Sequence, residues 1–252
     1  MFKSIIIMLF LSTRVRCFST SRSIRKNLSN IKMNLDKIQP KNNQQNKYDE
    51  FLKNPEINLI IGNGPAGTGK TLLACNSAIK QFENKKFKRI VITRPVISVE
   101  EDIGFLPGNI NQKMNPWTIP MFDVFREHFT SNELKYLVSE NILEIVPLGL
   151  MRGRTFKDAF IIADEMQNSS PTQMLMMLTR IGENSKMAIT GDLEQSDIKT
   201  INGFDDLIRK LNHKYDKNYH GMLKDKISMV NFKKKDVVRS EIVSTILDLY
   251  SN

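Results

Sequence analysis

A glycine-rich segment, Gly64–Thr71, constrains the fold of this chain more than any other feature. Its sequence, GPAGTGKT, fits the pattern G-x-x-x-x-G-K-[ST] at every defined position. It follows a short β-rich run, Ile57–Ile61, and opens the helical pattern of Lys70–Phe82. Between a strand and a helix, such a loop binds phosphate, because backbone N–H groups converge on the anion and the helix N-terminus adds a favourable dipole. The segment therefore predicts a phosphate-binding loop.

Two side chains at the end of this loop carry specific roles in holding a nucleoside triphosphate. Lys70 is expected to reach the β- and γ-phosphates, and the Thr71 hydroxyl to bind Mg²⁺. The loop thus predicts ATP and Mg²⁺ as the bound species. The residues expected to contact the nucleotide are Gly64, Pro65, Ala66, Gly67, Thr68, Gly69, Lys70 and Thr71.

A second signal is a buried strand pattern that ends in two acids. The segment AFIIADEMQ runs from Ala159 to Gln167, and Asp164 and Glu165 follow directly after its apolar part. At the carboxyl edge of a parallel sheet these carboxylates would lie beside the phosphate loop. Asp164 is predicted to hold Mg²⁺ through water, and Glu165 to polarise the water that attacks the γ-phosphate.

A third polar segment, TGDLEQ at Thr190–Gln195, again comes directly after a buried strand pattern. By itself, GD commonly marks a plain turn. At the end of a strand next to the acids, however, such a turn is placed to sense the γ-phosphate. Gln195 is therefore predicted to hydrogen-bond the γ-phosphate or the attacking water.

The apolar runs of the chain alternate with helical stretches, which favours an α/β fold. Continuous apolar strands are typical of a mostly parallel sheet with helices on both faces. Right-handed crossovers would then give a doubly wound sheet. The predicted strands are Ile57–Ile61, Arg89–Thr93, Ile142–Pro147, Ala159–Ala163, Lys186–Thr190 and Ile227–Phe232.

The charge of the chain is concentrated near its N-terminus. Of the net charge of +10, seven units come from residues 1–35, which contain no acid, so the remainder carries only +3. A mildly basic body permits contacts to nucleic-acid phosphates without requiring them. Two cysteines exclude a disulfide framework and indicate a reducing compartment. No stretch approaches the roughly 18 apolar residues that span a bilayer, so we expect no membrane partner.

Residues 1–35 have the composition of a targeting presequence. They combine Arg and Ser with an apolar run and lack acids, as mitochondrial transit peptides do. A secretory or bipartite plastid signal, or an uncleaved tail on a cytoplasmic protein, are the alternatives. Residues 36–47, with the polar sequence QPKNNQQNK, are predicted to be a linker, and residues 48–252 the folded domain.

Taken together, these motifs resemble the PhoH family of P-loop ATPases, which is related to the motor core of superfamily 1 helicases. The resemblance covers roughly residues 40–250. It implies a RecA-like P-loop NTPase fold, assembly into rings that are often hexamers, and work on single-stranded RNA. The segments that carry it are GPAGTGKT, VITRPV, GFLPGN, NPWTIP, LMRGRTF, IIADEMQN, LTRIGENSK and TGDLEQSD.

Several arginines are candidates for contacting phosphate. An arginine finger stabilises charge on the transferring phosphoryl group and is often supplied by a neighbouring subunit. Arg180 and Arg239 are the two predicted fingers, although VVRSEIV around Arg239 lacks the family's His-Pro. Arg94 follows a strand where a helicase core contacts phosphates, and Arg152 and Arg154 form a basic turn suited to anions.

Two residues upstream of the first strand resemble an adenine-reading element. Gln44 would hydrogen-bond the base and Tyr48 would stack on it.

The sequence therefore predicts a Mg²⁺-dependent ATP hydrolase, coupled to RNA binding or remodelling in a homo-oligomer. Two other functions stay open: a slow nucleotide-dependent switch that recruits protein partners, and a small-molecule kinase. The pairing of DEMQ with GDLEQ disfavours the kinase, which needs an acceptor base and an arginine-bearing lid. Stimulation of turnover by RNA would separate the motor from the switch.

Overall fold

The computed structural model describes residues 38–95, 110–197, 201–216 and 218–238. The predicted presequence, residues 1–35, lies outside this part of the chain, as does Arg239. None of the helices in the described ranges is long and apolar enough to cross a membrane.

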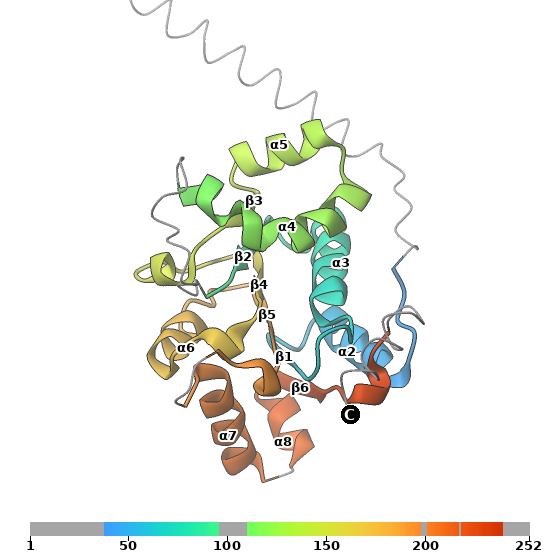
Figure 1. Ribbon diagram of the computed structural model, residues 1–252, viewed down its shortest axis with the longest axis vertical. Helices are drawn as coiled ribbons and strands as arrows, with labels where there is room; N and C mark the ends of the chain where they lie inside the picture. The colour runs from blue at the N-terminus through green and yellow to red at the C-terminus, as the bar shows by residue number, and fades with distance from the viewer. Residues whose placement is uncertain (1–37, 96–109, 198–200, 217, 239–252) are drawn as a thin grey trace, which may run out of the picture. The chain divides into compact units, whose positions relative to one another are not determined.

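Six parallel strands form a single sheet in the order β3-β2-β4-β5-β1-β6 (Figure 1). All six strands predicted from the sequence are confirmed, with ends that differ by at most two residues. Their apolar runs are buried because helices cover both faces of the sheet. The strands are β1 Leu59–Asn63, β2 Arg89–Thr93, β3 Leu143–Ile145, β4 Ala159–Ala163, β5 Lys186–Gly191 and β6 Ile227–Asn231.

The helices lie in two layers, with α2 and α3 on one side of the sheet and α6 and α7 on the other (Figure 1). Alternate strand residues, such as Ile61, Ile161 and Ile189, pack with Phe204 and Leu211 of α7 in one core cluster. The helices are α2 Asn43–Lys53, α3 Lys70–Glu83, α4 Ile110–His128, α5 Ser131–Ser139, α6 Pro171–Leu178, α7 Gly203–Tyr215 and α8 Tyr219–Lys224, with 3₁₀ turns η2 Leu148–Met151, η3 Met166–Asn168, η4 Leu193–Gln195 and η5 Lys234–Asp236.

The strand order brings three polar segments to one edge of the sheet. Because β5 lies between β1 and β4, the carboxyl ends of these strands are neighbours. In the register, Ala163 lies opposite Ile189, and Gly191 opposite Asn63. The phosphate loop follows β1, the paired acids follow β4 and the GDLEQ turn follows β5. This is the RecA-like α/β arrangement that the sequence predicts, with its ligand side at the carboxyl edge.

The predicted linker ends earlier than expected, because residues 43–47 form the first turns of helix α2. Asn42 caps this helix, its side chain accepting a hydrogen bond from the Gln45 amide at 2.9 Å. Tyr48 and Leu52 are buried along one face of the helix. The Asn- and Gln-rich composition indicated a linker, but a cap and an apolar stripe decide the structure, so the linker prediction is wrong for residues 43–47.

Lys186 joins the start of β5 to the end of α2. Its ammonium is buried and donates to the carbonyls of Leu52 and Asn54, both at 2.7 Å. A cation there stabilises the C-terminal carbonyls of the helix. Burial is the main cause that lowers the pKa of Lys186 to about 8.

This lysine should contribute a pH-dependent part of the stability. Between about pH 8 and pH 10.4, the unfolded chain holds the Lys186 proton and the folded chain does not, so this contribution rises with pH. The buried Tyr48 and Cys75, whose pKa values burial raises, act in the opposite direction in alkali. The variants Lys186→Met and Lys186→Arg cannot titrate in this window.

The free-energy difference between the wild-type protein and either variant, from urea unfolding at pH 7 to 10, should therefore shift in favour of the wild type by about 1–3 kcal/mol. A difference that stays constant with pH would contradict the buried, bonded ammonium.

Candidate active site

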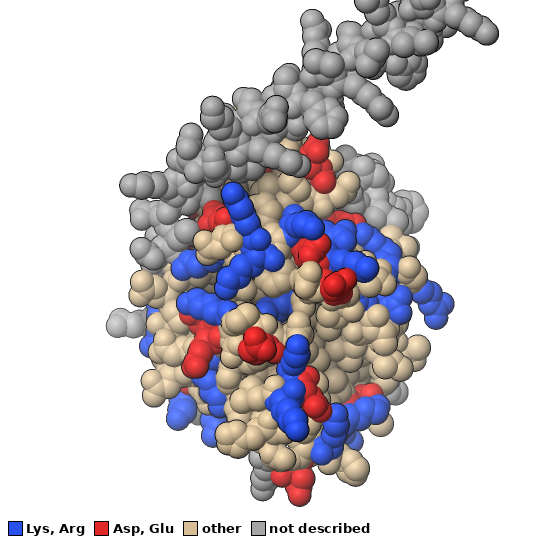
Figure 2. Space-filling model, turned by 180° about the vertical axis from the view of Figure 1, so that it is seen from behind, with Lys and Arg blue, Asp and Glu red and all other residues tan. Residues whose placement is uncertain are grey.

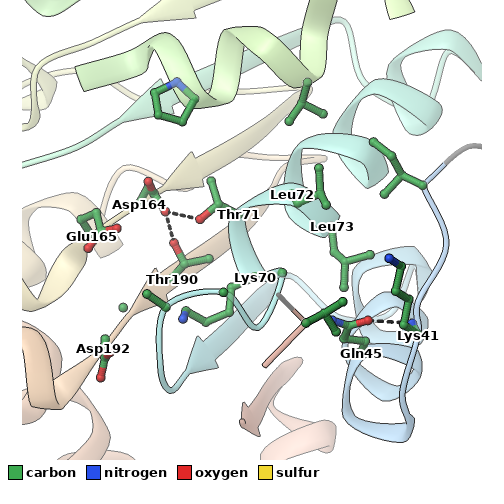
Figure 3. A pocket seen from close by; sticks show the side chains of 18 of the residues that line it. Lys41, Gln45, Lys70, Thr71, Leu72, Leu73, Asp164, Glu165, Thr190 and Asp192 are labelled. Carbon is green, nitrogen blue, oxygen red and sulfur yellow. Dashed lines mark hydrogen bonds between the residues drawn. The ribbon is translucent and has the colours of Figure 1, made fainter. Parts of the chain in front are cut away.

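A cavity of about 460 Å³ lies at the carboxyl edge of the sheet (Figure 3). The phosphate loop and the first turn of α3 line one side of it. The ends of β4 and β5 line another, and the segment before α2, together with Pro120 and Val124 of α4, completes it. The three motifs predicted from the sequence therefore surround one space.

The glycines of the phosphate loop are required by its backbone. Gly64 has a φ of 140° and Gly69, which precedes α3, a φ of 82°, both in the region that favours glycine. A side chain at Gly64 would also collide with the backbone of Phe232, which follows β6. The loop is held from outside by the amide of Val238, which donates to the carbonyl of Gly67 at 3.0 Å.

Lys70 lies inside the curve of this loop and is 8% exposed. Its ammonium donates to the carbonyls of Gly64 at 2.5 Å and Pro65 at 2.8 Å. Burial lowers the pKa of Lys70, while the carboxylates of Asp192 and Glu165 act to raise it. The cation is thus placed where the loop would receive phosphate groups.

Asp164 accepts hydrogen bonds from two hydroxyl groups in different parts of the chain. Its Oδ1 accepts hydrogen bonds from Thr71 Oγ1 at 2.6 Å and from Thr190 Oγ1 at 2.5 Å (Figure 3). The carboxylate is 5% exposed. Mg²⁺ bound to phosphates takes hydroxyl and carboxylate oxygens as its protein ligands, so Thr71 and Asp164 fit the predicted ion.

The sequence argument gave Thr190 no role, although it stands in the quoted TGDLEQ segment. The position of Thr190 in the sheet explains its role. Strand β5 is the neighbour of β4, and Thr190 follows Ile189, which pairs with Ala163 just before Asp164. Strand order, which only the structure supplies, makes it a partner of Asp164.

Glu165 stands in a left-handed backbone conformation, with φ 54° and ψ 39°. Residues other than glycine adopt it uncommonly, and here it turns the chain directly after β4. Its carboxylate lines the cavity, with Oε1 3.5 Å from the guanidinium of Arg94 and Oε2 accepting from Gln167 Nε2 at 2.6 Å. Arg94, expected to contact phosphates, thus pairs with the candidate catalytic acid.

The GDLEQ turn forms the remaining polar wall. Asp192 and Gln195 both line the cavity, and Gln195 is exposed at the end of η4. The Asp192 side chain accepts a hydrogen bond from the Glu194 amide at 3.0 Å, which shapes the turn. The structure therefore brings Gln195 to the same cavity as Lys70 and Glu165.

Neither of the two residues expected to read adenine, Gln44 and Tyr48, lines the cavity. Tyr48 is 0% exposed and packs edge-on against Phe232, with ring centroids 5.6 Å apart, so the prediction that it stacks on a base is wrong. Gln44 is not among the residues that line the cavity, whereas Gln45 is. Gln45 donates to the carbonyl of Thr68 at 2.9 Å and accepts from the amide of Lys41 at 2.7 Å.

The two predicted basic positions on the far side of the fold have structural partners. Arg154 pairs with Glu144 through two bonds of 2.6 and 2.9 Å and lies over the Phe156 ring, so it is not the free anion-binding turn that we predicted. Arg180, between α6 and the start of β5, bonds the carbonyls of Met176 and Arg154. Arg180 lies at the edge of the sheet where β4 and β5 begin, away from the cavity of its own chain. As an arginine finger it would therefore have to reach the nucleotide of a neighbouring subunit.

Fold and site together define a nucleotide-binding protein of the P-loop class. A family profile described as PhoH-like protein matches residues 37–251. The chain belongs to the PhoH-like protein family.

Curated relatives agree with this assignment. A PhoH-like protein of Bacillus subtilis (strain 168) is 39% identical over 216 residues, or 84% of this chain and 64% of the relative. Protein PhoH of Escherichia coli (strain K12) is 34% identical over 218 residues, or 85% of this chain and 58% of the relative. The chain thus spans less than two thirds of the length of either relative.

Two helicases are among the solved structures that match part of this chain. The UvsW helicase from bacteriophage T4 has a TM-score of 0.44 and 14% identity, covering 84% of this chain and 67% of that chain. The Pif1 helicase from Candida albicans has a TM-score of 0.39 and 15% identity, covering 85% of this chain and 44% of that chain.

Replacing Lys70 should weaken nucleotide binding. In Lys70→Ala the charge-assisted contact to the phosphates is lost, so affinity for a fluorescent ATP analogue should fall at least about tenfold. Lys80→Ala, at the other end of the same helix, is the matched control and should bind normally. Equal affinity of the wild-type protein and Lys70→Ala would refute the assignment of the phosphate loop.

Proposed function

We propose that this protein is a Mg²⁺-dependent ATP hydrolase. The observation that carries the proposal is the convergence of Thr71 and Thr190 on Asp164, in the same cavity as Lys70 and the Glu165 carboxylate. A phosphate loop, an oxygen site for the ion and a carboxylate beside them are the parts that phosphoryl transfer to water requires.

Each part of the chain has a defined task in this reaction. The backbone amides of the loop and the Lys70 ammonium bind and orient the triphosphate, which places the γ-phosphate towards β4 and β5. Thr71 and Asp164 would hold Mg²⁺, which would supply positive charge at the phosphate oxygens. Glu165 orients a water molecule and accepts its proton. Gln195, at the rim, is placed to bond the γ-phosphate.

The variant Glu165→Gln tests the hydrolytic role. The amide keeps the size of the side chain but cannot accept the proton, so turnover should fall about 100-fold or more while the affinity for ATP stays within about twofold. Phosphate release and analogue binding are measured on the same preparation. If affinity and rate fall together, Glu165 serves the structure of the site rather than the chemistry.

We propose further that the ATPase acts on RNA as a homo-oligomer, a ring in which a neighbouring subunit completes each pocket. The resemblance in sequence to the PhoH family favours both ideas. The face seen in Figure 2 carries many Lys and Arg side chains with acids among them. Such a surface supports scattered phosphate contacts more than a single basic track.

The turnover rate should then rise with protein concentration and with added single-stranded RNA at fixed salt. Mixing Arg180→Ala with Lys70→Ala subunits should restore part of the activity if Arg180 acts in trans, because some interfaces pair an intact pocket with an intact finger. Arg239→Ala in the same mixture tests the other candidate. A rate that depends on neither RNA nor protein concentration would favour a slow nucleotide switch acting as a monomer.

We propose the mitochondrion as the site of action, on the composition of residues 1–35. These residues fused to a fluorescent protein should direct it to mitochondria, and a secretory or plastid location of the fusion would refute this.

A further inference from the structure

Gln167 links the candidate catalytic carboxylate to the GDLEQ turn. The residue lies in η3, two positions after Glu165, and its side chain is only 1% exposed. Its Nε2 donates to Glu165 Oε2 at 2.6 Å, and its Oε1 accepts from the Asp192 amide at 3.1 Å. One buried amide group therefore spans the ends of β4 and β5.

Glu165 needs such a partner because little else restricts its side chain. The carboxylate is 37% exposed, and its other oxygen lies 3.5 Å from Arg94, longer than a strong charge-assisted hydrogen bond. A glutamate side chain has several rotatable bonds, so its orientation must be fixed by contacts. A group that orients water has to be held within about 0.5 Å of its working position.

The position of η3 is itself tied to the turn by further contacts. Ser196 Oγ donates to the Gln167 carbonyl at 3.0 Å, and the Asp197 amide donates to Asn168 Oδ1 at 3.0 Å. Asn202, which caps α7, donates to Ser196 Oγ at 3.2 Å. A shift of the turn that carries Gln195 would therefore move η3, and with it the donor that holds Glu165.

We propose that Gln167 is a positioning residue that sets the orientation of the Glu165 carboxylate relative to the Asp192–Gln195 turn. The proposal rests on the proposed function, in which Glu165 orients the attacking water. It gives the last residue of the DEMQ segment a task that the sequence argument left unassigned. Contact with the γ-phosphate at Gln195 and activation of water at Glu165 would then be coupled through one side chain.

Two substitutions separate this role from a merely structural one. Gln167→Met keeps the length of the side chain but removes both hydrogen bonds. Gln167→Glu keeps an oxygen that accepts from the Asp192 amide, but it sets a carboxylate against the carboxylate of Glu165, and like charges so close repel. A positioning role predicts that Gln167→Glu is the slower enzyme, whereas a role in holding the turn predicts that Gln167→Met is slower.

The experiment measures kcat and nucleotide affinity at pH 8 for both variants, with thermal unfolding to confirm that they are folded. We expect kcat to fall about 10- to 100-fold with affinity within about threefold, and Gln167→Glu to be the slower. Asn168→Ala is the matched control, since it also loses an anchor of the turn but not one to Glu165, and it should retain kcat within about threefold. The reverse order of the two variants, or an equal loss in the control, would overturn the proposal.

The double variant Glu165→Gln, Gln167→Met distinguishes failure of this inference from failure of the proposed function. If Gln167 acts through Glu165, the double variant should be no slower than Glu165→Gln alone, because residues that act as a unit are not additive. If Glu165→Gln is itself fully active, the role of Glu165 fails and the positioning role with it, and if the wild-type protein does not hydrolyse ATP, the proposed function fails. If Glu165→Gln is stalled and Gln167→Met turns over normally, only the positioning role fails.

Discussion

One oxygen atom, Oδ1 of Asp164, organises this site. Hydroxyl groups from Thr71, at the start of α3, and from Thr190, at the end of β5, both donate to it. The carboxylate follows β4, so three elements meet at a single buried acceptor. A buried carboxylate is costly unless it is hydrogen-bonded, and these two donors satisfy its Oδ1. The contact also fixes the distance between the phosphate loop and the acids.

Hydrogen bonds from other segments of the chain to its backbone hold the phosphate loop in place. Gln45 donates to the Thr68 carbonyl, and the Val238 amide donates to the Gly67 carbonyl. These anchors come from segments far apart in the sequence, one before β1 and one after β6, so the loop is held by both ends of the described domain. On the other side of Asp164, Gln167 connects Glu165 to the GDLEQ turn. A preorganised polar site of this kind needs little rearrangement during the reaction.

The features that could be predicted from the sequence are those that depend on residues adjacent in the chain. The phosphate loop, the acids and the six strands each follow from neighbouring residues, because apolar runs and glycine positions reflect local backbone requirements. The parts it missed depend on which strands are neighbours or which face of a helix is buried. Strand order alone brings Thr190 to Asp164 and Gln167 to the Asp192 amide, and the turn after β3 brings Arg154 back to Glu144. The choice of Gln44 over Gln45 is an error of helical phase: residues 43–47, the start of α2, were expected to belong to a linker, so the buried face of the helix could not be used.

The Mg²⁺ dependence of ATP hydrolysis tests the central role of Asp164 most directly. It is measured as the Mg²⁺ concentration that gives half the maximal rate, at saturating ATP, for the wild-type protein, Asp164→Asn and Thr190→Val. The account predicts that Asp164→Asn raises this concentration about tenfold or more, because the charge that holds the ion is lost, and that Thr190→Val raises it less, because the carboxylate remains. An unchanged Mg²⁺ dependence in Asp164→Asn would contradict it.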